Sequence, residues 1–391
     1  MKESKISTFG QGLIWFGAAV SLAEILTGTL IAPLGFKKGL LAILLGHLIG
    51  CTLFYFSGFI GAKTRLSAME TVKLSFGKKG AILFSSLNAL QLVGWTAVMI
   101  VSGAVAANSI YSFGGNAIWA IIISIFIILW VLIDIDKLSK LNTLAMIMLF
   151  ILTLILSFIV FKGNNISSFT ESISFGAAVE LSVAMPLSWL PLVSDYIRNA
   201  KKPKSSILVS TIVYFITSSW MYIIGMGAAI YTGESDIAKI MVTAGLGMAG
   251  LIIIIFSTVT TTFLDVYSAG VSLNSISKAF NEKWTAIAVC VIGMLLAIFT
   301  PITQYENFLY LIGSVFAPMI AIQIADNFIL KKDSTNKNFD IENLILWAVG
   351  FAIYRMFMKI DTPIGNTMPV MIITILLTTI IGKVKGTNKN E

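Results

Sequence analysis

Two prolines interrupt an apolar stretch near the middle of the chain, over residues 185–198. Pro186 and Pro191 flank the sequence Leu-Ser-Trp-Leu, and each proline lacks a backbone donor and clashes with the preceding turn of a helix. A broken backbone at membrane depth persists only where it faces protein or a water-filled cavity. The hydroxyl of Ser188 and the indole of Trp189 at this break therefore indicate a ligand site. The alternative is a proline kink with a packed tryptophan.

A carboxylate lies well inside the first apolar stretch. Gly17, Ser21, Glu24 and Gly28 are three or four residues apart, so they share one face of a helix. Close helix packing alone would explain the glycines. An acid inside a membrane helix is costly and usually functional, so Glu24 is a candidate binding residue.

Gln91, Trp95 and Met99 form a similar stripe in the third apolar stretch. Aromatic stripes in membrane helices often serve packing alone, but an amide buried in lipid needs a hydrogen-bonding partner. A flat heteroaromatic ring between Trp95 and Trp189, bonded at its edge by Gln91, would use all three groups. We therefore expect these three residues to bind a substrate.

The eighth apolar stretch carries a stripe of polar side chains at three- and four-residue spacing: Ser257, Thr261, Asp265, Ser268 and Ser272. Any single hydroxyl can bond to a carbonyl of its own helix, but that does not explain a continuous stripe that contains an acid. Hydroxyl oxygens facing the freed carbonyls of an interrupted first helix would form an all-oxygen cage for a hard cation such as sodium. Asp265, one turn deeper, would then meet the donors of the substrate.

The remaining candidates do not support an enzyme or an ATP-driven pump. His47 and Cys51 lie one helical turn apart, but two ligands do not make a metal site, and a buried pair is the simpler interpretation. The Gly-Lys-Lys-Gly segment at 77–80 lacks the pattern of a phosphate-binding loop. Asp195 and Arg198 have the spacing of a local ion pair. We find no nucleophile–base arrangement, so we expect no catalytic residue and no cofactor apart from a cation.

These residues lie in a chain that is hydrophobic throughout. Of its 391 residues, 57% are hydrophobic and 12% are charged, with a mean hydropathy of +0.90. Apolar runs of about 20 residues recur between short polar connections, as in a helical bundle in lipid. We predict a single all-α integral membrane domain with twelve transmembrane helices. The predicted spans are 10–33, 37–61, 80–108, 116–133, 140–161, 173–193, 205–231, 238–271, 283–299, 305–330, 343–358 and 367–384.

The basic residues predict the orientation of these spans. With both termini on the inner side, the basic residues of the outer segments are Lys37, Lys38, Lys162, Lys239 and Lys359. Arg355 falls within a span, and the other 21 of the 27 lysines and arginines lie in inner segments. This excess is the positive-inside pattern. It predicts cytoplasmic termini in a cell membrane, and it explains the net charge of +8 without a nucleic-acid partner.

The positions of the two interrupted spans indicate an internal repeat. Five spans separate the first span, which carries Glu24, from the sixth, which carries the two prolines. An odd number of spans per repeat inverts the second copy, and interrupted first helices in both halves are typical of inverted-repeat transporters. We predict a first repeat over 1–161, a second over 173–330 and two peripheral helices over 343–384.

Three segments resemble the nucleobase:cation symporter family, the cytosine, hydantoin and allantoin permeases. They are Gly94-Trp95; Ser188-Trp189 through Pro191, Asp195 and Arg198; and Phe308-Leu309-Tyr310-Leu311-Ile312-Gly313 through Pro318 to Ala325-Asp326-Asn327-Phe328. The resemblance covers roughly residues 1–330, and the run 185–196 is most similar to the hydroxymethylpyrimidine permease branch. It implies a LeuT-like fold of five-plus-five inverted repeats with two additional helices.

The resemblance also implies roles for particular residues. Aromatic stacking from the third and sixth helices falls on Trp95 and Trp189 here. The sodium site of sodium-coupled relatives uses first-helix carbonyls and eighth-helix side chains. The matching positions in this chain are Gly17, Val20, Ser257, Thr260 and Thr261.

The chain departs from cytosine-type relatives at three positions. Those relatives carry asparagines where this chain has Thr262 and Asp265, and a small residue where it has Glu24. Two acids favour a substrate rich in N–H donors, such as an aminopyrimidine. They also leave both sodium and proton coupling open.

We therefore expect a secondary active transporter that imports a pyrimidine, with hydroxymethylpyrimidine or a related thiamine precursor as first candidate. Its substrate-binding residues would be Glu24, Gln91, Trp95, Ser188, Trp189 and Asp265. A cytosine or other nucleobase permease is the alternative, and an amino-acid permease is disfavoured because two acids would repel a carboxylate. A sensor, a channel or an intramembrane enzyme fits the pattern less well. We expect contact with membrane lipid and no obligate protein partner.

Overall fold

The computed structural model describes residues 5–133, 135–163, 169, 172–234, 236–243, 247–300 and 305–387. Within these residues the chain is helical, with an isolated bridge between Ile6 and Ala200 and no β-strand. The helices are α1 (Thr8–Ala19), α2 (Leu22–Ile31), η1 (Ala32–Leu34), α3 (Phe36–Thr64), α4 (Ala68–Phe76), α5 (Gly80–Ile110), α6 (Gly115–Leu132), α7 (Ile135–Lys162), α8 (Phe175–Ser188), α9 (Val193–Ile197), α10 (Pro203–Thr232), α11 (Ile237–Thr243), α12 (Gly247–Ile276), α13 (Glu282–Phe299), α14 (Tyr305–Ile324), η2 (Ala325–Leu330), α15 (Ile341–Phe357) and α16 (Thr367–Thr387).

The predicted spans correspond to helices or helix pairs of this bundle. Among the described residues, eight helices are long and apolar enough to cross a membrane, or nine when the bent pair α1–α2 is counted as one span. Two further predicted spans correspond to shorter apolar helices, Met146–Lys162 within α7 and Phe175–Ser188, which is α8. The last of the twelve corresponds to α15. The all-α membrane architecture is therefore confirmed.

The predicted eighth span, 238–271, is corrected by the structure. It divides into α11 and α12, and α11 packs against both α12 and α5 instead of extending the α12 axis. α12 begins at Gly247, and glycine is a weak helix former. The polar stripe itself lies entirely on α12.

Both predicted interruptions are present. α1 ends at Ala19 and α2 begins at Leu22, with a bend of 54° between the two segments. Ser21 caps the second segment, because its hydroxyl accepts a hydrogen bond from the Glu24 backbone N–H at 3.2 Å. In the other half α8 ends at Ser188 and α9 begins at Val193, with Pro191 in the turn between them.

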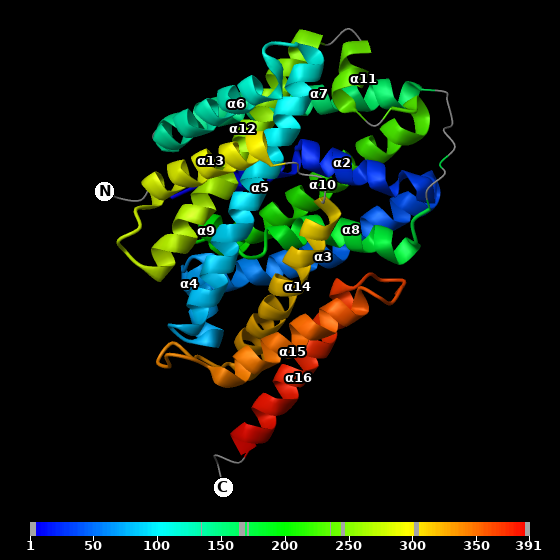
Figure 1. The fold of residues 1–391 in the computed structure, drawn as a ribbon. Helices are drawn as coiled ribbons and strands as arrows, with labels where there is room; N and C mark the ends of the chain where they lie inside the picture. Colours follow the sequence, from blue (N-terminus) through cyan, green and yellow to red (C-terminus); the bar gives the residue numbers. More distant parts are fainter. Residues whose placement is uncertain are drawn as a thin grey trace.

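The last two helices lie at the edge of the bundle. Figure 1 shows α15 and α16 side by side at its lower edge, next to α14. They are tied to α8 through Glu180, whose carboxylate accepts hydrogen bonds from the Tyr354 and Thr367 hydroxyls, both at 2.6 Å. The backbone N–H groups of Asn366 and Thr367 donate to the same carboxylate, at 2.6 and 2.8 Å. The interrupted helix α8 is thus anchored to the peripheral pair.

Candidate functional site

The end of α1 meets the polar stripe of α12. Because α1 stops at Ala19, the carbonyl groups of its last turn have no partner further along the helix. The Ser257 hydroxyl donates to the Val20 carbonyl oxygen at 2.5 Å, and the Thr261 hydroxyl donates to the Gly17 carbonyl oxygen at 3.2 Å. Four of the five residues implied as a cation site therefore lie together as two oxygen pairs.

Thr260, the fifth of these residues, has a different arrangement. Its hydroxyl bonds within its own helix, to the carbonyls of Phe256 and Ser257 at 2.9 and 3.2 Å. Thr260 nevertheless lines the same cavity as Gly17.

A small cavity lies between the two interrupted helices. Its volume is about 20 Å³, which is room for about one water molecule and far too little for a pyrimidine ring. Five of the six residues predicted to bind substrate contribute to its wall, and they come from α2, α5, the break after α8, and α12. These residues are Glu24, Trp95, Ser188, Trp189 and Asp265.

The two indoles that were expected to hold a flat ring line this cavity from different helices. Trp189 packs edge-on against Trp15, with ring centroids 5.5 Å apart. Trp95 packs against Phe308, also at 5.5 Å. Both tryptophans are less than 10% exposed. Aromatic neighbours on their outer sides therefore hold both indoles in place at the wall of the cavity.

The two predicted polar contacts at the cavity differ in their partners. The Ser188 hydroxyl donates to the Met185 carbonyl of its own helix at 2.7 Å. Asp265 is buried, and its carboxylate accepts no hydrogen bond from the described part of the chain. A substrate donor could therefore bind Asp265 without first displacing a protein group.

Gln91 is not among the residues that line the cavity. Its side-chain N–H donates to the Asn88 side-chain oxygen at 2.7 Å. Asn88 in turn donates to the Pro191 carbonyl at 3.0 Å and to the Ser272 hydroxyl at 2.8 Å. Sequence reasoning missed Asn88, although it lies one turn before Gln91 on the same stripe. Together Asn88 and Gln91 support the break between α8 and α9.

The Glu24 carboxylate is buried and points toward α10. It accepts hydrogen bonds from the Tyr214 hydroxyl at 2.7 Å and the Ser218 hydroxyl at 2.8 Å. His47 contacts the same Ser218 hydroxyl at 2.7 Å. Sequence reasoning treated His47 as half of a buried pair with Cys51 and did not connect it to Glu24. Among the described residues, no group of three histidines, cysteines or acids is placed to hold a metal ion.

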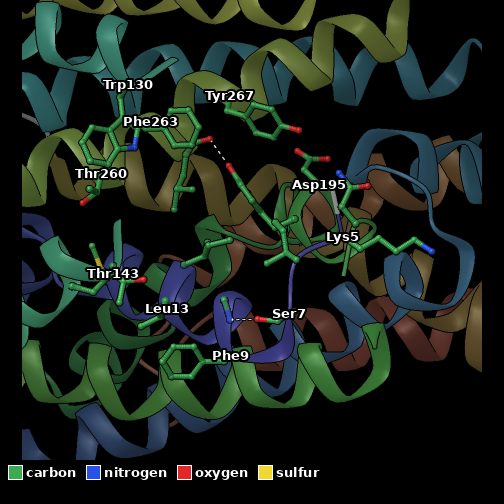
Figure 2. Close-up of a pocket in the computed structure, with 18 of the residues that line it drawn as sticks. Lys5, Ser7, Phe9, Leu13, Trp130, Thr143, Asp195, Thr260, Phe263 and Tyr267 are labelled. Carbon is green, nitrogen blue, oxygen red and sulfur yellow. Dashed lines mark hydrogen bonds between the residues drawn. The ribbon is translucent and has the colours of Figure 1, made fainter. Parts of the chain in front are cut away.

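A larger cavity of about 450 Å³ reaches the cation-site residues from one end of the bundle. Figure 2 shows Lys5 and Asp195 at one side of this cavity and Thr260 and Trp130 at the other. Gly17 also contributes to its wall. The end of α1 is thus accessible from the face that carries Lys5, whereas the small cavity lined by the two indoles has room for about one water molecule.

Asp195 and Arg198 do not form the local ion pair that their spacing suggested. Asp195 accepts a hydrogen bond from the Ala68 backbone N–H at 2.8 Å and so caps α4. Arg198 instead lies 3.9 Å from Glu70 and 3.8 Å from Glu282. Both residues therefore tie the second interrupted helix to neighbouring helices at the end of the bundle.

Two interrupted helices whose breaks meet at a common cavity define a membrane transporter with a LeuT-like fold. A solved structure of similar fold is that of Mhp1, a nucleobase-cation-symport-1 family transporter, in a closed conformation with bromovinylhydantoin bound. It has a TM-score of 0.82 and 18% sequence identity, and the match covers 96% of this chain and 92% of that one. A sodium-coupled sialic acid symporter also matches, with a TM-score of 0.72, 15% identity, and 97% and 90% of the two chains covered.

The chain belongs to the family described as permeases for cytosine/purines, uracil, thiamine and allantoin, whose model matches residues 2–382. The cytosine permease of Escherichia coli strain K12 is 26% identical over 324 residues, which are 81% of this chain and 75% of the relative. The hydantoin permease of Microbacterium maritypicum is 20% identical over 363 residues, with 84% and 74% covered. These relatives are transporters of nucleobase-like compounds, and the protein is a transporter and not an enzyme.

Proposed function

We propose that the protein is a secondary active transporter that imports a pyrimidine, with hydroxymethylpyrimidine or a related thiamine precursor as its first candidate. The observation that carries this proposal is the meeting of Trp95, Trp189 and Asp265 at one small cavity. Two indoles can stack on a planar ring, and a carboxylate without a hydrogen-bonding partner matches a ring that carries amino N–H groups. The family description, which includes cytosine, uracil and thiamine, is consistent with this class.

In this proposal the ring lies between Trp95 and Trp189. Asp265 and Glu24 accept hydrogen bonds from its edge, and the Ser188 hydroxyl completes the set. Gln91 would reach the ring only after its bond to Asn88 opens. The cavity must widen for any ring to enter, as expected of a carrier that alternates between open and closed conformations.

The proposed coupling cation is sodium, held by the carbonyl oxygens of Gly17 and Val20 and the hydroxyls of Ser257, Thr260 and Thr261. Hard cations prefer such oxygen ligands. Further support is the sodium coupling of the sialic acid symporter that shares the fold. Protons remain the alternative coupling ion.

We propose that both termini are cytoplasmic and that the protein lies in the cell membrane. The support is the concentration of basic residues in the predicted inner segments. In this orientation the 450 Å³ cavity would open to the cytoplasm near Lys5 and Lys201. The repeats at 1–161 and 173–330 would move against each other, while 343–384 stays peripheral. We propose lipid contact without nucleic acid or an obligate protein partner.

A second candidate function is a cytosine or other nucleobase permease, which the 26% identity to the Escherichia coli cytosine permease favours. A screen with purified protein separates the two. Melting temperatures would be measured with pyrimidines, purines and hydantoins, each with and without sodium. A ligand that binds the folded state raises the melting temperature, so hydroxymethylpyrimidine with sodium should give the largest shift. A larger shift with cytosine would favour the second candidate, and no shift with any of these classes would contradict both.

A further inference from the structure

Glu24, Ser218 and His47 form a continuous chain of hydrogen bonds across three helices. The Ser218 hydroxyl on α10 lies 2.8 Å from Oε2 of Glu24 on α2 and 2.7 Å from Nε2 of His47 on α3. The other ring nitrogen, Nδ1 of His47, lies 2.9 Å from the Ile43 carbonyl oxygen. All three side chains are buried.

The number of protons shared by Glu24, Ser218 and His47 follows from which of their atoms can donate a hydrogen bond. A carbonyl oxygen only accepts, so Nδ1 of His47 must carry the proton of its bond to Ile43. The Ser218 hydroxyl has one proton and two partners. If it donates to Glu24, then Nε2 of His47 must carry a proton and donate to Ser218. If it donates to His47, then Oε2 of Glu24 must be protonated.

Both arrangements contain one proton more than a neutral His47 with an ionised Glu24. We infer that Glu24, Ser218 and His47 are a proton-binding site that holds one proton in this conformation. The proton resides on Glu24 or on His47, and the Ser218 hydroxyl relays it between them by reversing its direction. No residue of the site needs to move for that transfer.

The described residues around Glu24 offer no positive charge to balance its carboxylate, so the bound proton has this role. Within the described ranges no lysine or arginine lies within ion-pair distance of the carboxylate. The neighbouring titratable groups are Tyr214, which donates to Oε1 of Glu24; Tyr222, whose ring packs edge-on to His47 at 4.7 Å; Cys51, one turn along α3; and Asp265 across the small cavity. None of these groups supplies a positive charge. Burying an ionised carboxylate without a basic partner costs more free energy than burying the protonated acid.

Loss of the proton would break one of the three hydrogen bonds. With Glu24 ionised and His47 neutral, the Ser218 hydroxyl satisfies only one of its two partners, so α10 loses one bond, either to His47 on α3 or to Glu24 on α2, where the Tyr214 bond remains. The helices α2 and α10 are close here, because a Cβ atom on Gly28 would clash with the Tyr222 carbonyl oxygen and one on Gly225 would clash with the Ile25 carbonyl oxygen. Release of the proton therefore removes one of the hydrogen bonds that join α2, α3 and α10 beside the small cavity. Any role of this proton release in transport rests on the proposed function, whereas the protonation itself does not.

His47 is the only histidine of the chain, so one nitrogen-15 magnetic resonance experiment reports on this site alone. The full-length protein would be labelled at its histidine, purified with a histidine-free tag and measured without substrate. The expected spectrum has a protonated Nδ1 and a hydrogen-bonded Nε2 that titrates in one step within about pH 5 to 9. A ring protonated only at Nε2, or a wild-type Nε2 signal that shows neither protonation nor loss of the Ser218 bond as the pH changes, would overturn the inference.

Ser218→Ala and Ser219→Ala are the test and control variants. Ser219 is the next residue of α10, is also buried, and its hydroxyl has no hydrogen-bonding partner in the described structure. Ser218→Ala should move the midpoint of the His47 titration by about one pH unit or more, a tenfold change in proton affinity. Ser219→Ala should leave it at the wild-type value. Equal midpoints in the wild type and Ser218→Ala would contradict the relay.

Infrared spectroscopy supplies a second measurement, because a protonated carboxyl group has its own carbonyl band. If the proton resides on Glu24, the wild type should lose such a band as the pH rises, and the Glu24→Gln protein should lack that band throughout. If the proton resides on His47, the imidazolium signal appears in the wild type instead. Absence of both signals in the wild type overturns the site. Neither experiment uses a pyrimidine. A positive result with no pyrimidine binding would therefore contradict only the proposed substrate, and a negative result with intact uptake would contradict only the proton site.

Discussion

The Ser257 hydroxyl donates a hydrogen bond of 2.5 Å to the Val20 carbonyl oxygen, which joins α12 to the point where α1 ends. For both oxygens to bind one cation, the Ser257 proton must turn away from Val20. The same two oxygens therefore serve either as a bond between helices or as two ligands of a cation. This exchange connects cation binding to the contact between the interrupted helix and α12.

Removing either α12 hydroxyl should weaken sodium binding. We expect Ser257→Ala and Thr261→Ala each to raise the sodium concentration for half-maximal uptake about 5- to 30-fold, since one oxygen ligand contributes roughly 1 to 2 kcal/mol. Uptake of the labelled substrate, measured against sodium concentration in proteoliposomes, checks this. The control is Thr262→Ala, because Thr262 is buried on the same helix but bonds only to the Thr258 carbonyl. An unchanged sodium dependence in both test variants would remove these residues from the cation site.

Trp189 should be required for substrate binding. Trp189→Ala removes one of the two indoles at the small cavity, and loss of one aromatic stacking surface costs roughly 1 to 3 kcal/mol. Uptake should fall at least tenfold, whereas Trp189→Phe should retain part of it. Trp284→Ala is the matched control, because this tryptophan is 66% exposed. Surface expression is measured for all three variants, and full uptake by a well-expressed Trp189→Ala protein would refute the stacking geometry.

Gly28 and Gly225 should be intolerant of any side chain. Each faces a backbone carbonyl of the partner helix, so a methyl group at either position must push α2 and α10 apart. We expect Gly28→Ala and Gly225→Ala to lower the free energy of unfolding by about 1 to 3 kcal/mol. Thermal unfolding in detergent measures the loss. Gly247→Ala serves as the control, since the nearest atom to its Cβ would be 3.8 Å away; an equal effect there would show that close packing is not the cause.

Glu180 should stabilise the peripheral helices without contacting substrate. Glu180→Gln replaces a carboxylate oxygen by an N–H donor among four donors, which leaves buried groups unpaired at a cost of about 3 kcal/mol. The melting temperature should fall, and proteolysis should become faster in the 358–366 connection. Glu306→Gln, an exposed acid at the start of α14, is the comparison and should behave as the wild type. A Glu180→Gln protein as stable as that control would show that the anchor contributes little.

Periodicity and composition were sufficient to predict the spans other than the eighth, the two interruptions and the residues that share each helix face. The Ser257–Thr261–Asp265 stripe follows from three- and four-residue spacing, and the break near Pro191 follows from local backbone chemistry. These features depend on residues close in sequence, so the sequence alone determined them.

The tertiary structure decided which helix each of those faces meets. Gln91 shares a stripe with Trp95, yet its amide bonds to Asn88 and supports the break after α8. Glu180 carries the same signal as Glu24, an acid inside an apolar span, but it anchors the peripheral helices. His47 joins Glu24 through a hydroxyl 171 residues further along the chain. Helical spacing specifies a direction around one axis, whereas a hydrogen bond between helices also depends on how the axes pack, and that packing arises from contacts across the whole bundle.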